Sequence, residues 1–219
     1  MLSTSTPHKQ VRLRDRPLLQ ALAAWYARVW IVTAIRPFDR HDWLLENILV
    51  VLVLALLVGS YRVFPLSDLS YLLITAFMTL HAIGAHWTYA QVPAGFWLQW
   101  VFGLARNPFD RLVHLCFGLL LAYPIREVFL RVANARGFWA YYLPLDVTLA
   151  FSALYEIMEM VVATLVAPGT GDAWLGTQGD VWDAQKDMAM AATGALLCMV
   201  VTATVRRLRR RPPVLLAGG

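Results

Sequence analysis

Long apolar stretches alternate with short polar ones along most of the chain, and this alternation predicts membrane-spanning helices. Each stretch approaches the roughly 20 residues that an α-helix needs to cross the hydrocarbon core of a bilayer. The predicted spans cover residues 18–35, 43–60, 65–86, 110–131, 138–166 and 180–205. We therefore expect an all-α fold, in which a transmembrane helical domain at 18–205 forms a multi-pass bundle of about six spans.

Two segments depart from this simple pattern. Residues 18–35 contain Gln20 and Arg28 within an otherwise apolar stretch, so an interfacial helix is the alternative to a first span. Residues 87–109 combine seven aromatic side chains with prolines and glycines. Aromatic rings with polar edges gather at the level of the lipid headgroups. We therefore expect a re-entrant or interfacial aromatic segment between spans three and four.

The overall composition supports a membrane protein and argues against a nucleic-acid binder. Of the 219 residues, 59% are hydrophobic and 15% are charged, whereas soluble domains carry about 25% charged residues. The net charge of +5 comes from short basic clusters that flank the apolar stretches.

Cys116 and Cys198 lie inside apolar stretches and are expected to be buried side chains rather than a disulfide. Residues 1–10 lack the apolar core of a secretory signal, so no cleavable signal peptide is expected.

The distribution of Lys and Arg predicts the orientation in the membrane. The two tails, residues 1–17 and 206–219, are both basic, and the expected loop at 167–179 contains no Lys or Arg. Because segments rich in Lys and Arg stay on the cytoplasmic side, we expect both tails to be cytoplasmic. An even number of spans fits this expectation, since five spans would place one basic tail outside.

Ionisable residues in or beside the predicted spans fall into four clusters. A charged side chain in a span costs about 2.5–3.5 kcal/mol on insertion scales, so such residues are expected to pair, bind a ligand or face water. The clusters are His81 with His86, Asp110 with His114, Glu156 with Glu159, and Asp180 with Asp183 and Asp187. In the last three clusters, spacings of three or four residues place the side chains on one helix face. Because consecutive spans alternate in direction, all four clusters are expected at the extracytoplasmic end of the bundle.

Imidazole and carboxylate groups together form a ligand set suited to Zn²⁺, Mn²⁺ or Fe²⁺. We predict a site for a divalent metal, with Zn²⁺ or Mn²⁺ as candidates, held by His81, His114, Glu156 and Asp187. Asp183 or Glu159 would then serve as acid or base, with Arg111 beside them. Two alternatives remain open. One is a proton-coupled transporter, and the other is a non-catalytic scaffold in which the acidic residues pair with one another and with Arg111.

Four strings of the sequence resemble a known family. They are HAIGAHWTYAQVP at 81–93, RNPFDRLVH at 106–114, YEIMEM at 155–160 and LGTQGDVWDAQKDM at 175–188. They are similar to the YjdF-type family of bacterial inner-membrane proteins, a domain of unknown function. The resemblance implies a bacterial inner-membrane location and signature positions that also include His86, Asp110, Asp180 and Gln185. A looser similarity links the acidic motifs to VanZ-like membrane proteins, which commonly have Gln where this chain has Glu159.

The sequence therefore predicts a multi-pass inner-membrane protein with a polar site, lined by His, Asp and Glu, at its extracytoplasmic face. The expected partners are membrane lipids and a lipid-linked small molecule of the cell envelope, which the site would bind or modify. No nucleic acid is expected as a partner.

Overall fold

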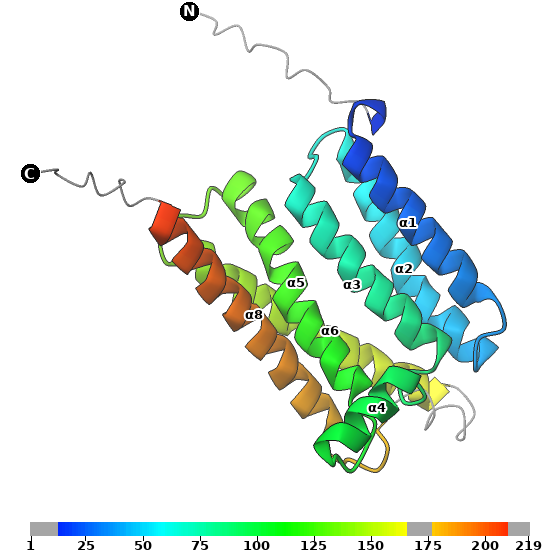
Figure 1. Cartoon of the computed structure of the whole chain (residues 1–219). Helices are drawn as coiled ribbons and strands as arrows, with labels where there is room; N and C mark the ends of the chain where they lie inside the picture. Colours follow the sequence, from blue (N-terminus) through cyan, green and yellow to red (C-terminus); the bar gives the residue numbers. More distant parts are fainter. Residues whose placement is uncertain (1–12, 166–176, 210–219) are drawn as a thin grey trace, which may run out of the picture.

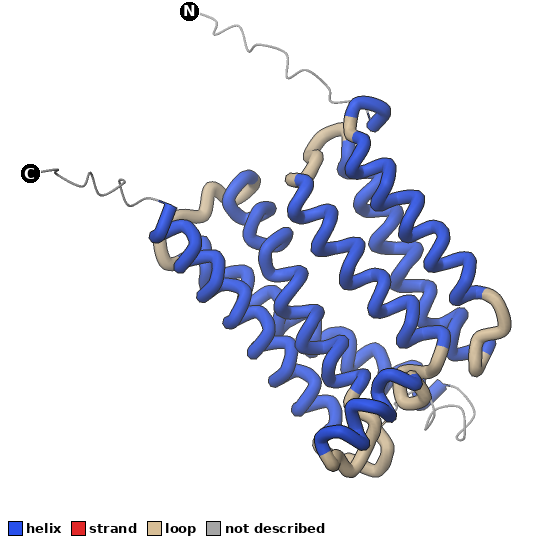
Figure 2. The backbone as a smooth tube through the Cα atoms, in the orientation of Figure 1, coloured by secondary structure: helices blue, strands red, loops and turns tan. Residues whose placement is uncertain are grey.

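Six long helices, arranged up and down, form a bundle (Figure 1). The computed structural model describes residues 13–165 and 177–209. The long helices are α1 (Pro17–Ala34), α2 (Arg40–Tyr61), α3 (Asp68–His86), α5 (Phe109–Arg131), α6 (Trp139–Leu165) and α8 (Asp183–Arg209). A 3₁₀ turn, η1 (Leu13–Asp15), precedes α1, and the shorter helix α4 (Pro93–Phe102) lies between α3 and α5. The described residues contain no strand (Figure 2), which confirms the predicted all-α class.

Among the described residues, five helices are long and apolar enough to cross a membrane, namely α2, α3, α5, α6 and α8. The remaining long helix, α1, runs alongside α2 and α3 (Figure 1). The indole N–H of Trp25 in α1 donates to Thr79 Oγ1 of α3 at 3.2 Å. Tyr26 of α1 is buried against Val50 and Met78. The first helix therefore lies lengthwise in the bundle rather than across its end.

The helices form two groups, α1 to α3 on one side and α5, α6 and α8 on the other (Figure 1). The groups meet where α3 packs against α5, and the rings of Phe77 and Phe117 are 5.5 Å apart between centroids. Within the second group, α5 and α8 approach most closely at glycines. A Cβ atom at Gly118 of α5 would overlap the backbone of Ala191 in α8. Small residues allow such close helix contact.

Two helices begin later than the sequence predicted. α3 begins at Asp68 rather than at 65, because the Ser67 hydroxyl caps it by accepting from the backbone N–H of Ser70 at 3.3 Å. α8 begins at Asp183 rather than at 180. Asp180 lies in the preceding turn, where its carboxylate accepts from the backbone N–H of Trp182 at 3.1 Å. Parts of four predicted segments lie outside the described residues: 1–12 of the first tail, 166 of the fifth span, 167–176 of the loop and 210–219 of the last tail.

α4 lies at one end of the bundle, away from the first residues of α1 and the last residues of α8 (Figure 1). We call this the α4 end. Its Trp97 and Trp100 are 61% and 81% exposed, as expected of an interfacial aromatic segment. The wholly buried Asn107 holds the start of α4 in place, since its side-chain amide donates to the carbonyl of Val92 at 3.0 Å. Its backbone N–H also donates to Gln178 Oε1, just before α8, at 3.0 Å.

Candidate metal centre

Three ionisable side chains from two helices meet near the α4 end. Asp110 and His114 lie one turn apart in α5, and Asp187 faces them from α8. One ligand atom from each residue lies within 4.8 Å of the other two. Two of the residues, His114 and Asp187, were predicted as metal ligands and Asp110 as a site residue. The folded chain therefore brings together residues that are 77 positions apart in the sequence. We call Asp110, His114 and Asp187 the ligand trio.

Two of the three residues of the ligand trio are buried, and one of these keeps an oxygen atom without a partner. His114 is 8% exposed and Asp187 is 2% exposed. Asp187 Oδ1 is buried and has no hydrogen-bond partner among the described residues. A buried polar atom without a partner is unfavourable by about 1–3 kcal/mol, and more when it is charged. A cation bonded to this oxygen would remove that penalty.

Glu156 extends the centre from α6. Its Oε1 atom lies 3.4 Å from His114 Nε2 and has no hydrogen-bond partner in the described part of the chain. Glu159 lies one turn further along α6, on the same face. Glu156 therefore stands beside the ligand trio, and Glu159 lies on the same face of α6.

The geometry of the trio fits a divalent cation. Zn–N and Zn–O bonds of about 2.0–2.2 Å place two ligands of one ion at most about 4.4 Å apart. The trio lies within 4.8 Å, so its three side chains would have to move closer together around an ion. One imidazole with carboxylates suits Zn²⁺ or Mn²⁺, and three protein ligands leave a coordination position open, as in catalytic sites.

Two arginines neutralise the acidic residues beside the trio. Arg106 Nη1 forms an ion pair with Asp183, and Arg111 Nη2 forms one with Asp180. Arg111 Nη2 also lies 3.4 Å from Asp183 Oδ1. Asp183 was predicted as an acid or base, and it takes part here in a buried ion-pair network. Arg106 was not among the predicted site residues.

Two further residues predicted for the site, Asp180 and Gln185, lie outside the ligand trio. Lys186 Nζ donates to Asp180 Oδ2 at 2.6 Å. This hydrogen bond, together with the backbone N–H of Trp182, holds the pKa of Asp180 well below its usual value. Gln185 is exposed. Neither Asp180 nor Gln185 belongs to the ligand trio.

The two histidines of α3 lie apart from the trio. The hydroxyl of Tyr89 donates to His81 Nδ1 at 2.7 Å, and His81 Nε2 lies 3.8 Å from Glu46 Oε2. His86 Nδ1 donates to the carbonyl of Thr33 at 2.8 Å. His81, predicted as a metal ligand, thus joins a second polar cluster around Glu46, and His86 links α3 to α1.

The sequence prediction missed Glu46, which is 4% exposed in α2. The hydroxyl of Tyr155 in α6 donates to both of its carboxylate oxygens, at 3.1 and 3.3 Å. The signal was present in the sequence, because a lone carboxylate inside an apolar span indicates a functional position. The position of its partner Tyr155 could not be inferred without the fold.

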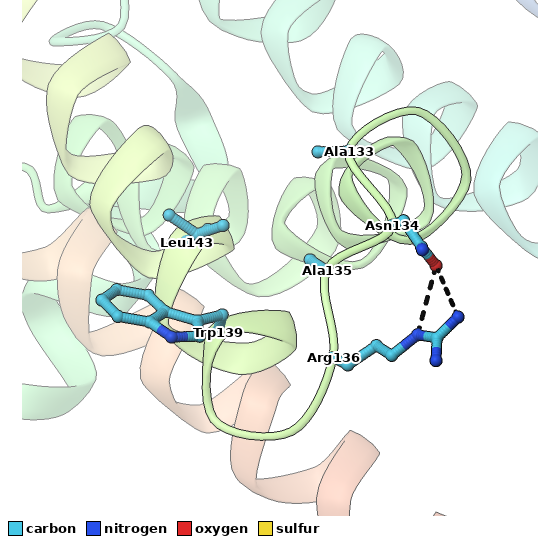
Figure 3. A pocket seen from close by; sticks show the side chains of 6 residues that line it. All are labelled: Ala133, Asn134, Ala135, Arg136, Trp139 and Leu143. Atoms are coloured by element: carbon cyan, nitrogen blue, oxygen red, sulfur yellow. Dashed lines mark hydrogen bonds between the residues drawn. The ribbon is translucent and has the colours of Figure 1, made fainter.

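A surface hollow of about 540 Å³ lies at the opposite end, between the end of α5 and the start of α6 (Figure 3). It is lined by Ala133, Asn134, Ala135, Arg136, Trp139 and Leu143. Arg136, its one ionisable residue, donates to Asn134 Oδ1 at 3.3 and 3.2 Å and points away from Trp139. This hollow offers no catalytic side chain, so the ligand trio is the candidate site.

The chain is similar to proteins already described. A family model with the description "Predicted membrane protein (DUF2238)" matches residues 18–208. The Inner membrane protein YjdF of Escherichia coli (strain K12) is 39% identical over 196 residues, which cover 88% of this chain and 93% of that protein. No solved structure matches the chain. The family match includes every residue of the ligand trio.

Proposed function

This chain belongs to the DUF2238 family of predicted membrane proteins, and from that premise we propose that it is a metal-binding protein acting on a lipid-linked envelope molecule. The YjdF-type resemblance and the multi-pass, inner-membrane character agree with the relative from Escherichia coli. The looser similarity to VanZ-like proteins stays a prediction.

The ligand trio carries the proposal. Asp110, His114 and Asp187 offer one nitrogen and two oxygen ligands within 4.8 Å of one another. The unpartnered Asp187 Oδ1 supports a cation there, because a buried carboxylate oxygen is stable only when something bonds to it. A Zn²⁺ or Mn²⁺ ion is the ligand that suits these atoms best.

The chain's own residues then have distinct roles. A bound divalent ion supplies a Lewis acid and lowers the pKa of a coordinated water towards neutrality. Glu156, 3.4 Å from His114, would exchange a proton with a molecule bound beside the trio. Glu159 is the second carboxylate on that face of α6. Arg106 and Arg111 hold the neighbouring aspartates and limit the negative charge around the trio.

We place this centre at the extracytoplasmic face. The basic tails favour the cytoplasmic side. The first residues of α1 and the last residues of α8, which lead to these tails, lie away from α4 (Figure 1). The α4 end, which carries the trio, then faces outward.

Metal binding by the purified full-length protein tests the proposal. After treatment with a chelator, the protein is titrated with Zn²⁺ and with Mn²⁺ by calorimetry, and thermal unfolding is followed with and without metal. We expect about one ion per chain and a rise in unfolding temperature, because a ligand that binds only the folded state stabilises it. His114→Ala and Asp187→Asn should each lower the affinity by at least about 100-fold, since even outer partners of metal ligands contribute 10–100-fold.

His41→Ala is the matched control, because His41 is exposed at the start of α2 and lies outside the trio. It should bind metal as the unaltered protein does. Equal metal binding by His114→Ala and the unaltered protein, or no binding by either, rejects the metal site.

One observation favours the scaffold alternative for part of the cluster. Asp180 and Asp183 both pair with arginines and need no ligand to be satisfied. A scaffold built on these pairs predicts that Asp183→Asn destabilises the fold, whereas the metal site predicts that Asp187→Asn abolishes metal binding in a folded protein. Destabilisation by Asp183→Asn in a protein that binds no metal favours the scaffold, whereas loss of metal binding in a folded Asp187→Asn variant favours the metal site.

A further inference from the structure

A buried arginine near the end of the bundle opposite α4 has no role in the metal site. Arg126 lies in α5 and is 3% exposed. An arginine side chain cannot be deprotonated in proteins, so Arg126 carries a full positive charge inside the bundle. A buried charge without an opposite charge is strongly unfavourable, and a partner for Arg126 is therefore expected.

Among the described residues, no acidic side chain pairs with Arg126. Glu127, the next residue in α5, pairs with Arg131 at 2.8 Å instead. The charged side chain that acts on Arg126 is a second cation, Arg206 in the last turn of α8. Because the two positive charges repel each other, an anion that contacts both would stabilise this end of the bundle.

The unpartnered atoms of Arg126 belong to the edge of the guanidinium that recognises anions. Nε and Nη2 are both buried and have no hydrogen-bond partner in the part of the chain that the structure describes. Together, such N–H groups form a rigid fork that matches two oxygen atoms of one phosphate or carboxylate group. The ring of Tyr141 in α6 lies over the guanidinium, with its centroid 4.6 Å from Arg126 Cζ. A ring stacked on this face does not use the N–H groups, because they lie in the guanidinium plane.

Arg126 lies close to the level of the lipid headgroups. It is five residues before the last residue of α5, about 7.5 Å along the helix at 1.5 Å per residue. α5 is a candidate membrane span, and the headgroup layer on each side of a bilayer is about 5–7 Å thick. Long arginine side chains near a helix end extend towards the headgroups. Arg126 therefore reaches a lipid phosphate by extending along α5, while the acyl chains of the lipid stay in the bilayer.

We propose that Arg126, with Arg206 beside it, binds the phosphate group of one anionic phospholipid in the leaflet at this end of the bundle. A phosphate group supplies the two oxygen atoms that the fork requires. Basic sites between transmembrane helices on the cytoplasmic side are suited to anionic lipid headgroups, and the orientation proposed above places this end on the cytoplasmic side. The inference goes beyond the proposed function and does not depend on the ligand trio, which lies near the α4 end.

Lipid retention by the full-length protein tests the site. The protein is incubated in detergent with one of three probes: dioleoyl phosphatidylglycerol, dioleoylglycerol, which has the same chains and no phosphate, or inorganic phosphate. Native mass spectrometry counts the lipid molecules retained per chain, and thermal unfolding is followed with each probe. We expect one retained phosphatidylglycerol per chain and a higher unfolding temperature with that lipid, because a ligand that binds only the folded state stabilises it. Neither effect is expected with the other two probes.

Arg126→Met removes the charge and the fork but keeps a long side chain. It should lower the retention of phosphatidylglycerol at least about tenfold, which corresponds to the loss of a charged hydrogen bond. Arg62→Met is the matched control. Arg62 is exposed directly after the last residue of α2, and α2 ends on the same side of the bundle (Figure 1). This variant loses the same charge and should retain the lipid as the unaltered protein does.

Equal retention of phosphatidylglycerol by Arg126→Met and Arg62→Met, or no retention by the unaltered protein, overturns the proposal. Equal retention of dioleoylglycerol also overturns it, because the phosphate group is then not recognised. If inorganic phosphate raises the unfolding temperature as much as the phospholipid does, the assignment to a lipid is wrong. If Arg126→Met does not fold, Arg126→Lys takes its place. Lysine keeps the charge but lacks the fork, so retention should still fall severalfold, and unchanged retention by Arg126→Lys rejects recognition by the fork.

Discussion

Gly118 of α5 lies directly against the backbone carbonyl of Ala191 in α8, so closely that a Cβ atom at Gly118 would overlap that oxygen. His114 lies one turn before Gly118, and Asp187 lies one turn before Ala191. The distance between the two helices at this contact therefore sets the distance between the ligands that they carry.

Gly118→Ala should weaken both the fold and the metal site. Overpacking a close helix contact costs about 1–3 kcal/mol. The helices must separate to admit the methyl group, so the trio should widen and its metal affinity should fall. Thermal unfolding and metal titration measure the two effects. Gly59→Ala in α2 is the control, because a Cβ there meets no atom within 4 Å, and that variant should be unchanged or slightly more stable.

Asp183→Asn should lower the stability of the fold more than it lowers metal affinity. Asp183 is 4% exposed and pairs with Arg106 and Arg111, and removing one partner of a buried ion pair costs about 3–5 kcal/mol. Asp68→Asn is the comparison, since Asp68 pairs with Arg16 at the surface and such pairs contribute about 0–1 kcal/mol. Chemical denaturation of both variants measures the difference. A similar loss of unfolding free energy in Asp183→Asn and Asp68→Asn would show that the Asp183 ion pairs are not desolvated.

Glu127→Gln should loosen the start of α3. The Glu127 carboxylate in α5 accepts from the backbone N–H of Ser67 at 2.9 Å and from the hydroxyl of Ser70 at 2.5 Å. A carboxylate at a helix N-terminus also interacts favourably with the helix dipole. We expect a loss of about 1.5–3 kcal/mol, the contribution of a charged hydrogen bond. Hydrogen exchange at the first turn of α3 measures this, with the exposed Asp146→Asn as control; unchanged exchange in Glu127→Gln argues against the cap.

The hydrogen bond from Lys186 to Asp180 predicts an acid-sensitive contribution to stability. It lowers the pKa of Asp180 in the folded chain below that of the unfolded chain, which is about 3.9. Such a group stabilises the fold fully above the unfolded value, and the stabilisation disappears as the pH falls through the folded value. The unfolding temperatures of the unaltered protein and of Lys186→Gln should therefore differ most at pH 5 and above and converge as the pH approaches 2. A difference that is constant over this range contradicts the assignment.

Much of the fold and part of the site could be predicted because they depend on local properties of the chain. Apolar length defines the helices, and a spacing of four residues places Asp110 and His114 on one face of α5. The alternating direction of the spans then brings Asp187 of α8 to the same end.

Contacts that depend on the rotation of a helix about its own axis could not be predicted in the same way. His81 lies at the expected end of α3, but its ring faces Glu46 and Tyr89 instead of the ligand trio. Tyr155 lies 109 residues from Glu46. In the sequence, nothing distinguishes it from the other aromatic residues of the apolar spans. Only the folded arrangement, which brings α6 within hydrogen-bond reach of α2 at this point, gives it a partner.

The two hydrogen bonds that Asn107 donates at the α4 end come from different parts of the residue. Its side-chain amide holds the chain before α4, and its backbone N–H holds the chain before α8. A substitution at position 107 would therefore free the carbonyl of Val92 and leave the backbone bond to Gln178 in place. The two segments at this end of the bundle can thus be released separately.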